Sequence, residues 1–265
     1  MRIKIIVEYD GTNYQGWQVQ PGGVTIQLRL EEALHKLTGQ TIRVTGAGRT
    51  DAGVHAKGQT AAFDCDTPIP IEQFARAMNS RLPKDIAVKH ACYVPDCFNP
   101  RKDCVQKQYV YSILVSPLRP AFCRQVWHIP WELDAQIMQE AARIFVGTHS
   151  FHAFCKKRDR HVEEEDVIRT ITRCEFLCEK ESPPAGVSES EWESIYRSPW
   201  RGRLVIEGRS FLYAMVRSIM GALVEVGKGK VALSELEALF SPSHKGRFPF
   251  CAPAEGLCLE WVRYE

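Results

Sequence analysis

One stretch of the sequence combines residue types that could do chemistry. GAGRTDAGVHAKGQTAAFD (residues 46–64) places Asp51 between Gly48 and Gly53, with Arg49 two positions before it. Residues i and i+2 of an extended chain project to one side, and a neighbouring cation favours the ionised form of a carboxylate. Glycines also allow a ligand to approach the backbone closely. An ionised, positioned carboxylate can act as a nucleophile or as a base, so Asp51 and Arg49 are candidate site residues.

Asp51 also has a purely structural interpretation. T-D-A-G is a good turn sequence, because aspartate accepts hydrogen bonds from the backbone and glycine adopts positive φ. The residues around Asp51 therefore leave two roles open, a catalytic carboxylate and a turn residue.

Arg217 lies in FLYAMVRSIMGALVEV (residues 211–226), where nearly every neighbour is apolar. A buried guanidinium needs an anion. Glu225 stands eight residues further on, about 12 Å along a helix and too far to pair directly. The sequence thus predicts a carboxylate from elsewhere in the chain, with Asp51 as a candidate. The alternative is an arginine at the helix edge that reaches solvent.

Tyr109 and Tyr111, in KQYVYSI, fall on one face of an expected strand. Packing in a core or across strands is the usual role of such a pair. A ring that stacks on a nucleic-acid base is the functional alternative. Both roles stay open for this pair.

Other catalytic and metal sites lack their sequence signatures. The 10 cysteines include no C-x-x-C pair, which favours reduced thiols over a zinc site. VGKGK (residues 226–230) lacks the spacing of a P-loop, and His149 and His152 have no helical E-x-x-H context. No serine or cysteine stands in a nucleophile elbow.

The net charge of +2 conceals an asymmetry. Residues 179–193 hold five acids and one lysine, a balance of −4, so the rest of the chain carries +6. Clustered cations suit a polyanion such as a phosphate backbone, although an ordinary solvated surface would explain any single cluster. The clusters are Arg76, Arg81 and Lys84; Arg101, Lys102 and Lys107; and Lys156, Lys157, Arg158 and Arg160.

The elements that must position these residues alternate between strands and helices. RIKIIVEYD (residues 2–10) has the alternation of a strand. A helix is expected over 26–37, capped by Thr25 and ended by Gly39. Further expected elements are extended segments at 42–48 and 54–64, a helix over 71–82 and a strand over 86–93.

The second half follows a similar plan. Strands are expected at 106–116, 170–180 and 203–211, and helices at 135–146 and 211–226, the latter apolar nearly all round and therefore buried. Ser234 and Glu237 read as a capping box. We therefore predict an α+β fold of two related halves, each with a mostly antiparallel sheet packed by helices, and a catalytic cleft between them.

The expected boundaries are 1–105 for the N-terminal half, which carries the Asp51 loop, and 106–265 for the C-terminal half. Within the latter, the acidic, proline-containing segment 179–200 is expected to be a flexible insertion. No apolar stretch is long enough for a membrane span, and the chain opens on a strand pattern without a signal-like apolar region. A cytoplasmic location is the expectation.

These residues leave three functional interpretations. The first is an enzyme that uses Asp51 on a nucleic-acid substrate. The second is a non-catalytic RNA-binding module in which Asp51 shapes a turn. The third is a small-molecule hydrolase with an aspartate nucleophile.

Six segments, in order along the chain, resemble the signature blocks of the tRNA pseudouridine synthase A family. They are YDGTNYQGWQ (9–18), GRTDAGVHA (48–56), KQYVYSI (107–113), GTHSFHAF (147–154), FLYAMVRSIMG (211–221) and GLCLEWVRY (256–264). The resemblance covers essentially the whole chain, and GRTDAGVHA is highly specific. One departure is Ser150, which stands where the family often has an acidic residue.

The resemblance implies a pseudouridine synthase fold and an isomerase that converts uridine to pseudouridine at positions 38, 39 and 40 of the tRNA anticodon stem-loop. Asp51 would be the catalytic aspartate, paired with Arg217. Arg49 would help to hold the space of the flipped-out nucleotide. Tyr109 would stack on the target uracil and would also be a candidate base. The resemblance further implies a homodimer that binds tRNA and needs no metal or organic cofactor.

Overall fold

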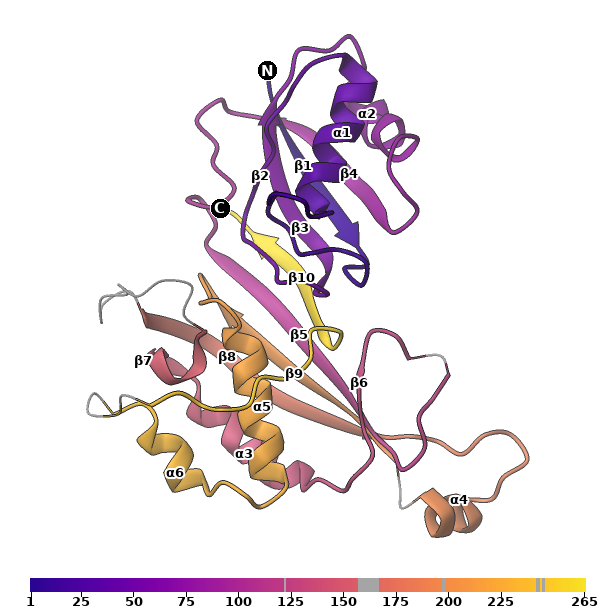
Figure 1. Cartoon of the computed structure of the whole chain (residues 1–265), viewed down its shortest axis with the longest axis vertical. Coiled ribbons are helices and arrows are strands. Elements are labelled where there is room, and N and C mark those ends of the chain that lie inside the picture. The colour runs from indigo at the N-terminus through magenta and orange to yellow at the C-terminus, as the bar shows by residue number, and fades with distance from the viewer. Residues whose placement is uncertain (122, 157–166, 197–198, 242–243, 245) are drawn as a thin grey trace. The chain divides into compact units, whose positions relative to one another are not determined.

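The computed structural model describes residues 1–121, 123–156, 167–196, 199–241, 244 and 246–265. The chain forms two compact units, one of Met1–Gln108 with Cys258–Glu265 and the other of Tyr109–Leu257. Both combine helices with strands that are mostly antiparallel to their neighbours, so the predicted α+β class is confirmed (Figure 1). None of the helices in the described ranges is long and apolar enough to cross a membrane.

The sheet of the first unit has the strand order β4-β1-β3-β10, with β2 added beside β3. β1 is antiparallel to β3 and to β4, and β2 is antiparallel to β3. The last strand runs parallel to β3, with Cys258 opposite His55. The bounds are β1 (Arg2–Tyr9), β2 (Thr45–Gly46), β3 (His55–Asp64), β4 (Ile86–Val94) and β10 (Leu257–Arg263).

The core of this unit follows the predicted patterns. The alternation of β1 buries every second side chain, from Ile3 to Tyr9. Helices α1 (Ile26–Thr38) and α2 (Ile71–Asn79) pack against the sheet of this unit (Figure 1). The predicted caps of α1 are confirmed, because Thr25 Oγ1 accepts from Leu28 N–H at 3.3 Å and Gly39 ends the helix at φ 74°.

The sheet of the second unit has the order β5-β9-β8-β7, with β6 parallel to β5. β8 is antiparallel to both β7 and β9. The first three residues of β5 belong to the first unit. The bounds are β5 (Gln106–Val115), β6 (Trp127–Ile129), β7 (Gly147–Ser150), the 3₁₀ helix η1 (His152–Phe154), β8 (Ile168–Lys180) and β9 (Trp200–Gly208).

The helices of the second unit are α3 (Ala135–Ile144), α4 (Glu189–Tyr196), α5 (Met215–Gly227) and α6 (Leu233–Ala238). α4 lies within the segment 179–200 that the sequence predicts to be an insertion. The predicted burial of the apolar helix is confirmed, because along α5 every residue other than Arg217 and Glu225 is buried.

Two local predictions in this unit are wrong. α5 begins at Met215 rather than at Phe211, because Ala214 adopts a left-handed conformation (φ 61°) that breaks the helix there. The predicted capping box is also misplaced. α6 begins at Leu233, and the Glu235 carboxylate accepts from Ala232 N–H at 2.8 Å, so Ser234 lies inside the helix.

Candidate active site

The loop that carries Asp51 joins β2 to β3, and the sheet holds its first half. Ala47 N–H donates to Thr60 O at 2.8 Å, which continues the pairing of β2 with β3. Gln59, which is fully buried in β3, donates from Nε2 to Gly48 O at 2.9 Å. The backbone is therefore fixed three residues before the aspartate.

A second loop, residues 10–17, holds the other half of the Asp51 loop. Trp17 N–H donates to Thr50 O at 3.1 Å, and Gly53 N–H donates to Tyr14 O at 3.2 Å. These bonds flank the aspartate on both sides along the chain. Because both bonds join a backbone N–H to a backbone carbonyl, they fix the path of the loop itself. We call the two loops together the clasp.

Two glycines of residues 10–17 make this close approach possible. Gly16 has φ +89°, and a Cβ there would lie 2.6 Å from Thr50 O. A Cβ at Gly11 would overlap Val54 O. Gly11 N–H also donates to Nδ1 of the buried His55 at 3.1 Å. Any side chain at these two glycines would push the clasp apart.

The side chain of Thr50 anchors the clasp to β1. Thr50 Oγ1 lies 2.8 Å from Tyr9 Oη, and both side chains are buried. Burial raises the pKa of Tyr9 well above its ordinary value, so the phenol is neutral and serves as a hydrogen-bonding group. Its neighbours along the chain are more open, since Arg49 is exposed and Asp51 is half-buried. This alternation is typical of an extended segment with one anchored side chain.

The two tyrosines of β5 have different surroundings in the second unit. Tyr111 is fully buried, donates from Oη to Pro253 O at 2.7 Å, and has its pKa raised well above the usual value by burial. Tyr109 is 7% exposed, and its ring packs edge-on against Phe211 with 5.1 Å between the centroids. Tyr111 therefore has a structural role in the core of this unit.

Arg217 projects from the first turn of α5 and is half-buried. Its Nε donates to Ala252 O at 2.8 Å, and Ala252 N–H donates to Arg217 O at 3.0 Å. The segment before β10 therefore orients the guanidinium. Arg49 and Asp51 share one loop of the first unit, whereas Tyr109 and Arg217 belong to the second.

Lys107 lies where the sequence does not predict it. Together with Arg101 and Lys102 it is predicted to form a surface cluster, but its side chain is only 7% exposed while the other two residues are exposed. Lys107 is on the buried face of β5, the face that also carries the two tyrosines. The strand alternation in the sequence already contained this signal.

The remaining predicted cations lie on the surface where the structure describes them. Arg76, Arg81, Lys84 and Lys156 are exposed, and Lys157, Arg158 and Arg160 lie outside the described residues. These side chains are available to solvent in their own units.

Among the residues that the structure describes, no three histidine, cysteine, aspartate or glutamate side chains gather where they could hold a metal ion. His149 Nε2 lies 3.0 Å from Val146 O, and its ring lies 4.6 Å from that of Phe240. All 10 cysteines are free thiols, and Cys65, Cys104, Cys155 and Cys174 are buried.

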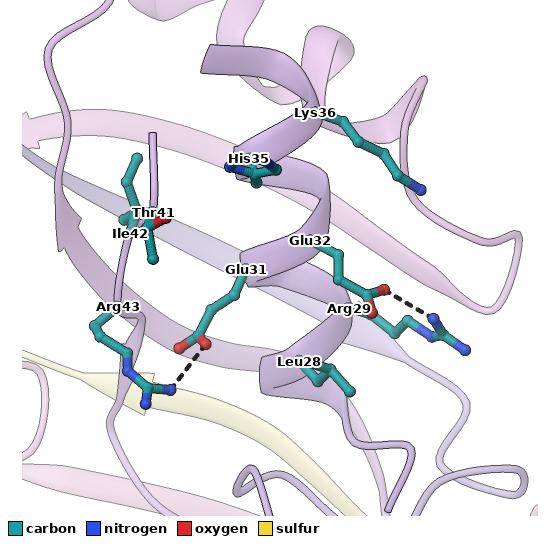
Figure 2. Close-up of a pocket in the computed structure, with 9 residues that line it drawn as sticks. All are labelled: Leu28, Arg29, Glu31, Glu32, His35, Lys36, Thr41, Ile42 and Arg43. Carbon is teal, nitrogen blue, oxygen red and sulfur yellow. Dashed lines mark hydrogen bonds and ion pairs between the residues drawn. The ribbon is translucent and has the colours of Figure 1, made fainter. Parts of the chain in front are cut away.

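A surface hollow on α1 has the acidic residues of a possible site, but these are already paired. Arg29 Nη1 lies 2.8 Å from Glu32 Oε2, and Arg43 Nη1 lies 3.1 Å from Glu31 Oε2. Figure 2 draws both ion pairs. The hollow is lined by Leu28, Arg29, Glu31, Glu32, His35, Lys36, Thr41, Ile42 and Arg43, and therefore not by the Asp51 loop. The clasp is the better candidate for chemistry.

Comparison with known proteins identifies the family of the chain. The family model described as tRNA pseudouridine synthase matches residues 5–101 and 141–265. The chain belongs to this family of isomerases, which convert uridine to pseudouridine in tRNA. The family assignment made from the six sequence blocks is therefore confirmed.

Relatives of the same name match along the full chain. The tRNA pseudouridine synthase A of Syntrophotalea carbinolica is 39% identical over 99% of this chain and 96% of its own length. The protein of that name from Bacillus pumilus is 37% identical over 100% of both chains. Among solved structures, the archaeal box H/ACA sRNP Nop10-Cbf5 complex aligns with 84% of this chain and 52% of its own, at 11% identity and a TM-score of 0.31, too weak a likeness for an argument.

Proposed function

We propose that this chain isomerises uridine to pseudouridine at positions 38, 39 and 40 in the anticodon stem-loop of tRNA, and that Asp51 is its catalytic carboxylate. The observation that supports this most directly is the clasp. Backbone hydrogen bonds on both sides of Asp51 hold its loop, and a rigid mount is what a reacting group needs. A turn residue alone would not require a second loop closed over it.

The reaction needs one ionised carboxylate and no second substrate. The target uridine first leaves the base stack, at a cost of a few kcal/mol. The bond between N1 and C1′ breaks, the uracil turns, C5 bonds to C1′, and the hydrogen on C5 leaves as a proton while N1 gains one. Asp51 starts the reaction either by attack on C1′ or by removal of the 2′ proton. Product and substrate are isomers, so the proposal includes no cofactor and no metal.

Arg217 and Arg49 supply the positive charge in this proposal. Arg217 pairs with Asp51 and keeps it ionised, because a nearby cation lowers the pKa of a carboxylate. The hydrogen bond from Nε to Ala252 O supports this role, since it leaves the guanidinium in one orientation. Arg49 is exposed beside Asp51 and holds the space vacated by the flipped nucleotide.

Tyr109 is the stacking residue of the proposal. Its ring is held edge-on by Phe211, and an aromatic face held in one plane suits a uracil, because every base has a π-face to stack on. Its neighbour Tyr111 is unsuited to this role, because its hydroxyl is bonded to Pro253 O within the core.

We further propose that the protein works in the cytoplasm as a homodimer, with each tRNA in contact with both subunits. The exposed cations Arg76, Arg81 and Lys84 are suited to a phosphate backbone. Contacts of this kind make binding strongly dependent on salt concentration.

Tritium release from tRNA labelled with 5-³H-uridine tests the proposal, since H5 is lost only when C5 bonds to the sugar. Three tRNA substrates, each with a single uridine at position 38, 39 or 40, should all release tritium, and a tRNA with cytidine at all three positions should not. Binding without release from any of them would leave an RNA-binding module. Release from the cytidine control would place the modified uridine elsewhere.

A further inference from the structure

Lys107 is a buried cation at the clasp, and the proposed function gives it no role. Its side chain is 7% exposed. Burying an ammonium group is costly unless an anion or several hydrogen-bond acceptors compensate the charge. A lysine that served only to bind RNA phosphates would be expected on the surface, as Lys102 is.

The side chain of Lys107 ends against the first half of the Asp51 loop. A Cβ built at Gly48 would lie 3.6 Å from Lys107 Cε and 3.9 Å from its Nζ. The ammonium therefore lies over the backbone of a glycine that Gln59 holds from the other side through Gly48 O. Both contacts fall within the first unit.

Asp51 follows Gly48 by three residues, so their Cα atoms are at most about 11 Å apart. Because Lys107 carries a positive charge and its ammonium lies over Gly48, it favours the ionised form of Asp51. The charge is held in place by burial, whereas a surface lysine would be screened.

We propose that Lys107 is a positioning residue for Asp51: its buried ammonium fixes the backbone at Gly48 and keeps the carboxylate ionised near neutral pH. This inference rests on the proposed function, in which Asp51 reacts as an anion. It adds a third cation to Arg217 and Arg49, the two arginines to which the proposed function gives the positive charge.

The test compares Lys107→Met and Lys107→Gln, which remove the charge, with Lys107→Arg, which keeps it. Lys36→Met is the control, because Lys36 is an exposed lysine of the same unit that belongs to none of the cation clusters. Single-turnover tritium release is followed from pH 5 to pH 9 with saturating enzyme, tRNA affinity is measured separately, and thermal unfolding shows which variants are folded. Two charge-removing variants are used so that one of them can fail to fold without loss of the test.

We expect the folded charge-removing variants to react about 10-fold more slowly at the acidic end of the range, and the acidic midpoint of their rate profile to lie at higher pH. Lys107→Arg should keep the midpoint, and Lys36→Met should keep both rate and midpoint. An unmoved midpoint with a weakened tRNA affinity would overturn the inference and make Lys107 an RNA contact. An unmoved midpoint with affinity intact would leave a purely structural lysine. Failure of the proposed function differs from both, because the natural chain would then release no tritium.

Discussion

The clasp of the first unit and the site residues of the second are held in different ways. Around Asp51, the path of the loop is fixed by backbone hydrogen bonds and by glycines that admit a second loop. Tyr109 is held by ring packing and Arg217 by one backbone carbonyl, on elements that are rigid for other reasons. Damage to the clasp should therefore displace several groups at once, whereas changes in the second unit should remove one side chain at a time.

After substitution of Asp51 itself, the largest loss of activity and stability is expected when a Cβ atom is added to a glycine inside the clasp. Gly16→Ala should lower the free energy of unfolding by about 2–4 kcal/mol, because of its φ of +89° and the approach to Thr50 O at 2.6 Å. The rate should fall about 100-fold as the loop moves. Urea unfolding and tritium release measure the two effects.

Gly48→Ala is the matched control for this substitution. A Cβ there would meet only Lys107, at an ordinary contact distance of 3.6 Å. The control should therefore cost less than about 1 kcal/mol of stability. Equal losses for both glycine variants would contradict the account of the clasp.

Substitutions of the two tyrosines of β5 should separate loss of activity from loss of stability in the second unit. Tyr109→Ala should slow tritium release about 10- to 100-fold through lost stacking, while Tyr109→Phe keeps the ring. Tyr111→Phe should instead lower the free energy of unfolding by about 1–3 kcal/mol, because Pro253 O loses its donor. Rates and urea midpoints of the three variants check this assignment. A larger rate loss for Tyr111→Phe than for Tyr109→Ala would reverse it.

The anchor of the clasp on β1 should be measurable as a pairwise coupling. Tyr9→Phe and Thr50→Val each remove one side of the bond that joins Tyr9 Oη to Thr50 Oγ1 at 2.8 Å. In a double-mutant cycle of unfolding free energies, the coupling should be about 1 kcal/mol. Additive losses would mean that this bond does not hold the loop.

The smallest effect concerns Cys258. This residue of β10 lies opposite His55, the first residue of β3, in the parallel pairing of the two strands. Burial raises the pKa of its thiol to about 12. In the unfolded chain the thiol ionises at about pH 9, so unfolding releases a proton above that pH and stability falls as the pH rises toward 12. Cys258→Ala should remove about 0.8 kcal/mol of the stability loss between pH 7 and pH 9.5, as measured by urea unfolding. Identical pH dependence in both chains would contradict the burial of this thiol.

Sequence patterns predicted the elements whose signals are local. α1 has its cap at Thr25 and its end at Gly39 as expected, since both signals lie within a few residues of the helix. The sequence pattern places the start of α5 too early, because apolar residues continue before Met215. No residue type in the sequence marks the left-handed φ of 61° at Ala214. At α6, Ser234 and Glu237 have the three-residue spacing of a capping box, but Ala232 and Glu235 have the same spacing. The structure uses the second pair, because the Glu235 carboxylate accepts from Ala232 N–H.

For the candidate site, the sequence identified individual residues more readily than the backbone contacts that hold those residues in place. Asp51 and Arg49 stand out by type and spacing, but the closure of residues 10–17 over them joins segments about 35 residues apart through backbone groups that any residue carries. The pairing of β10 with β3 is more distant still. The burial of Lys107 could have been read from strand alternation, but its charge and its neighbours favoured a surface position.

The most direct test of the central claim is single-turnover tritium release by Asp51→Asn, with tRNA binding and thermal unfolding measured on the same sample. Asparagine keeps the size and the turn propensity of aspartate and removes only the anionic charge. The account predicts a rate below about one-thousandth of that of the natural chain, with tRNA affinity and stability nearly unchanged. A rate within about tenfold of the natural one would contradict it and return Asp51 to the role of a turn residue.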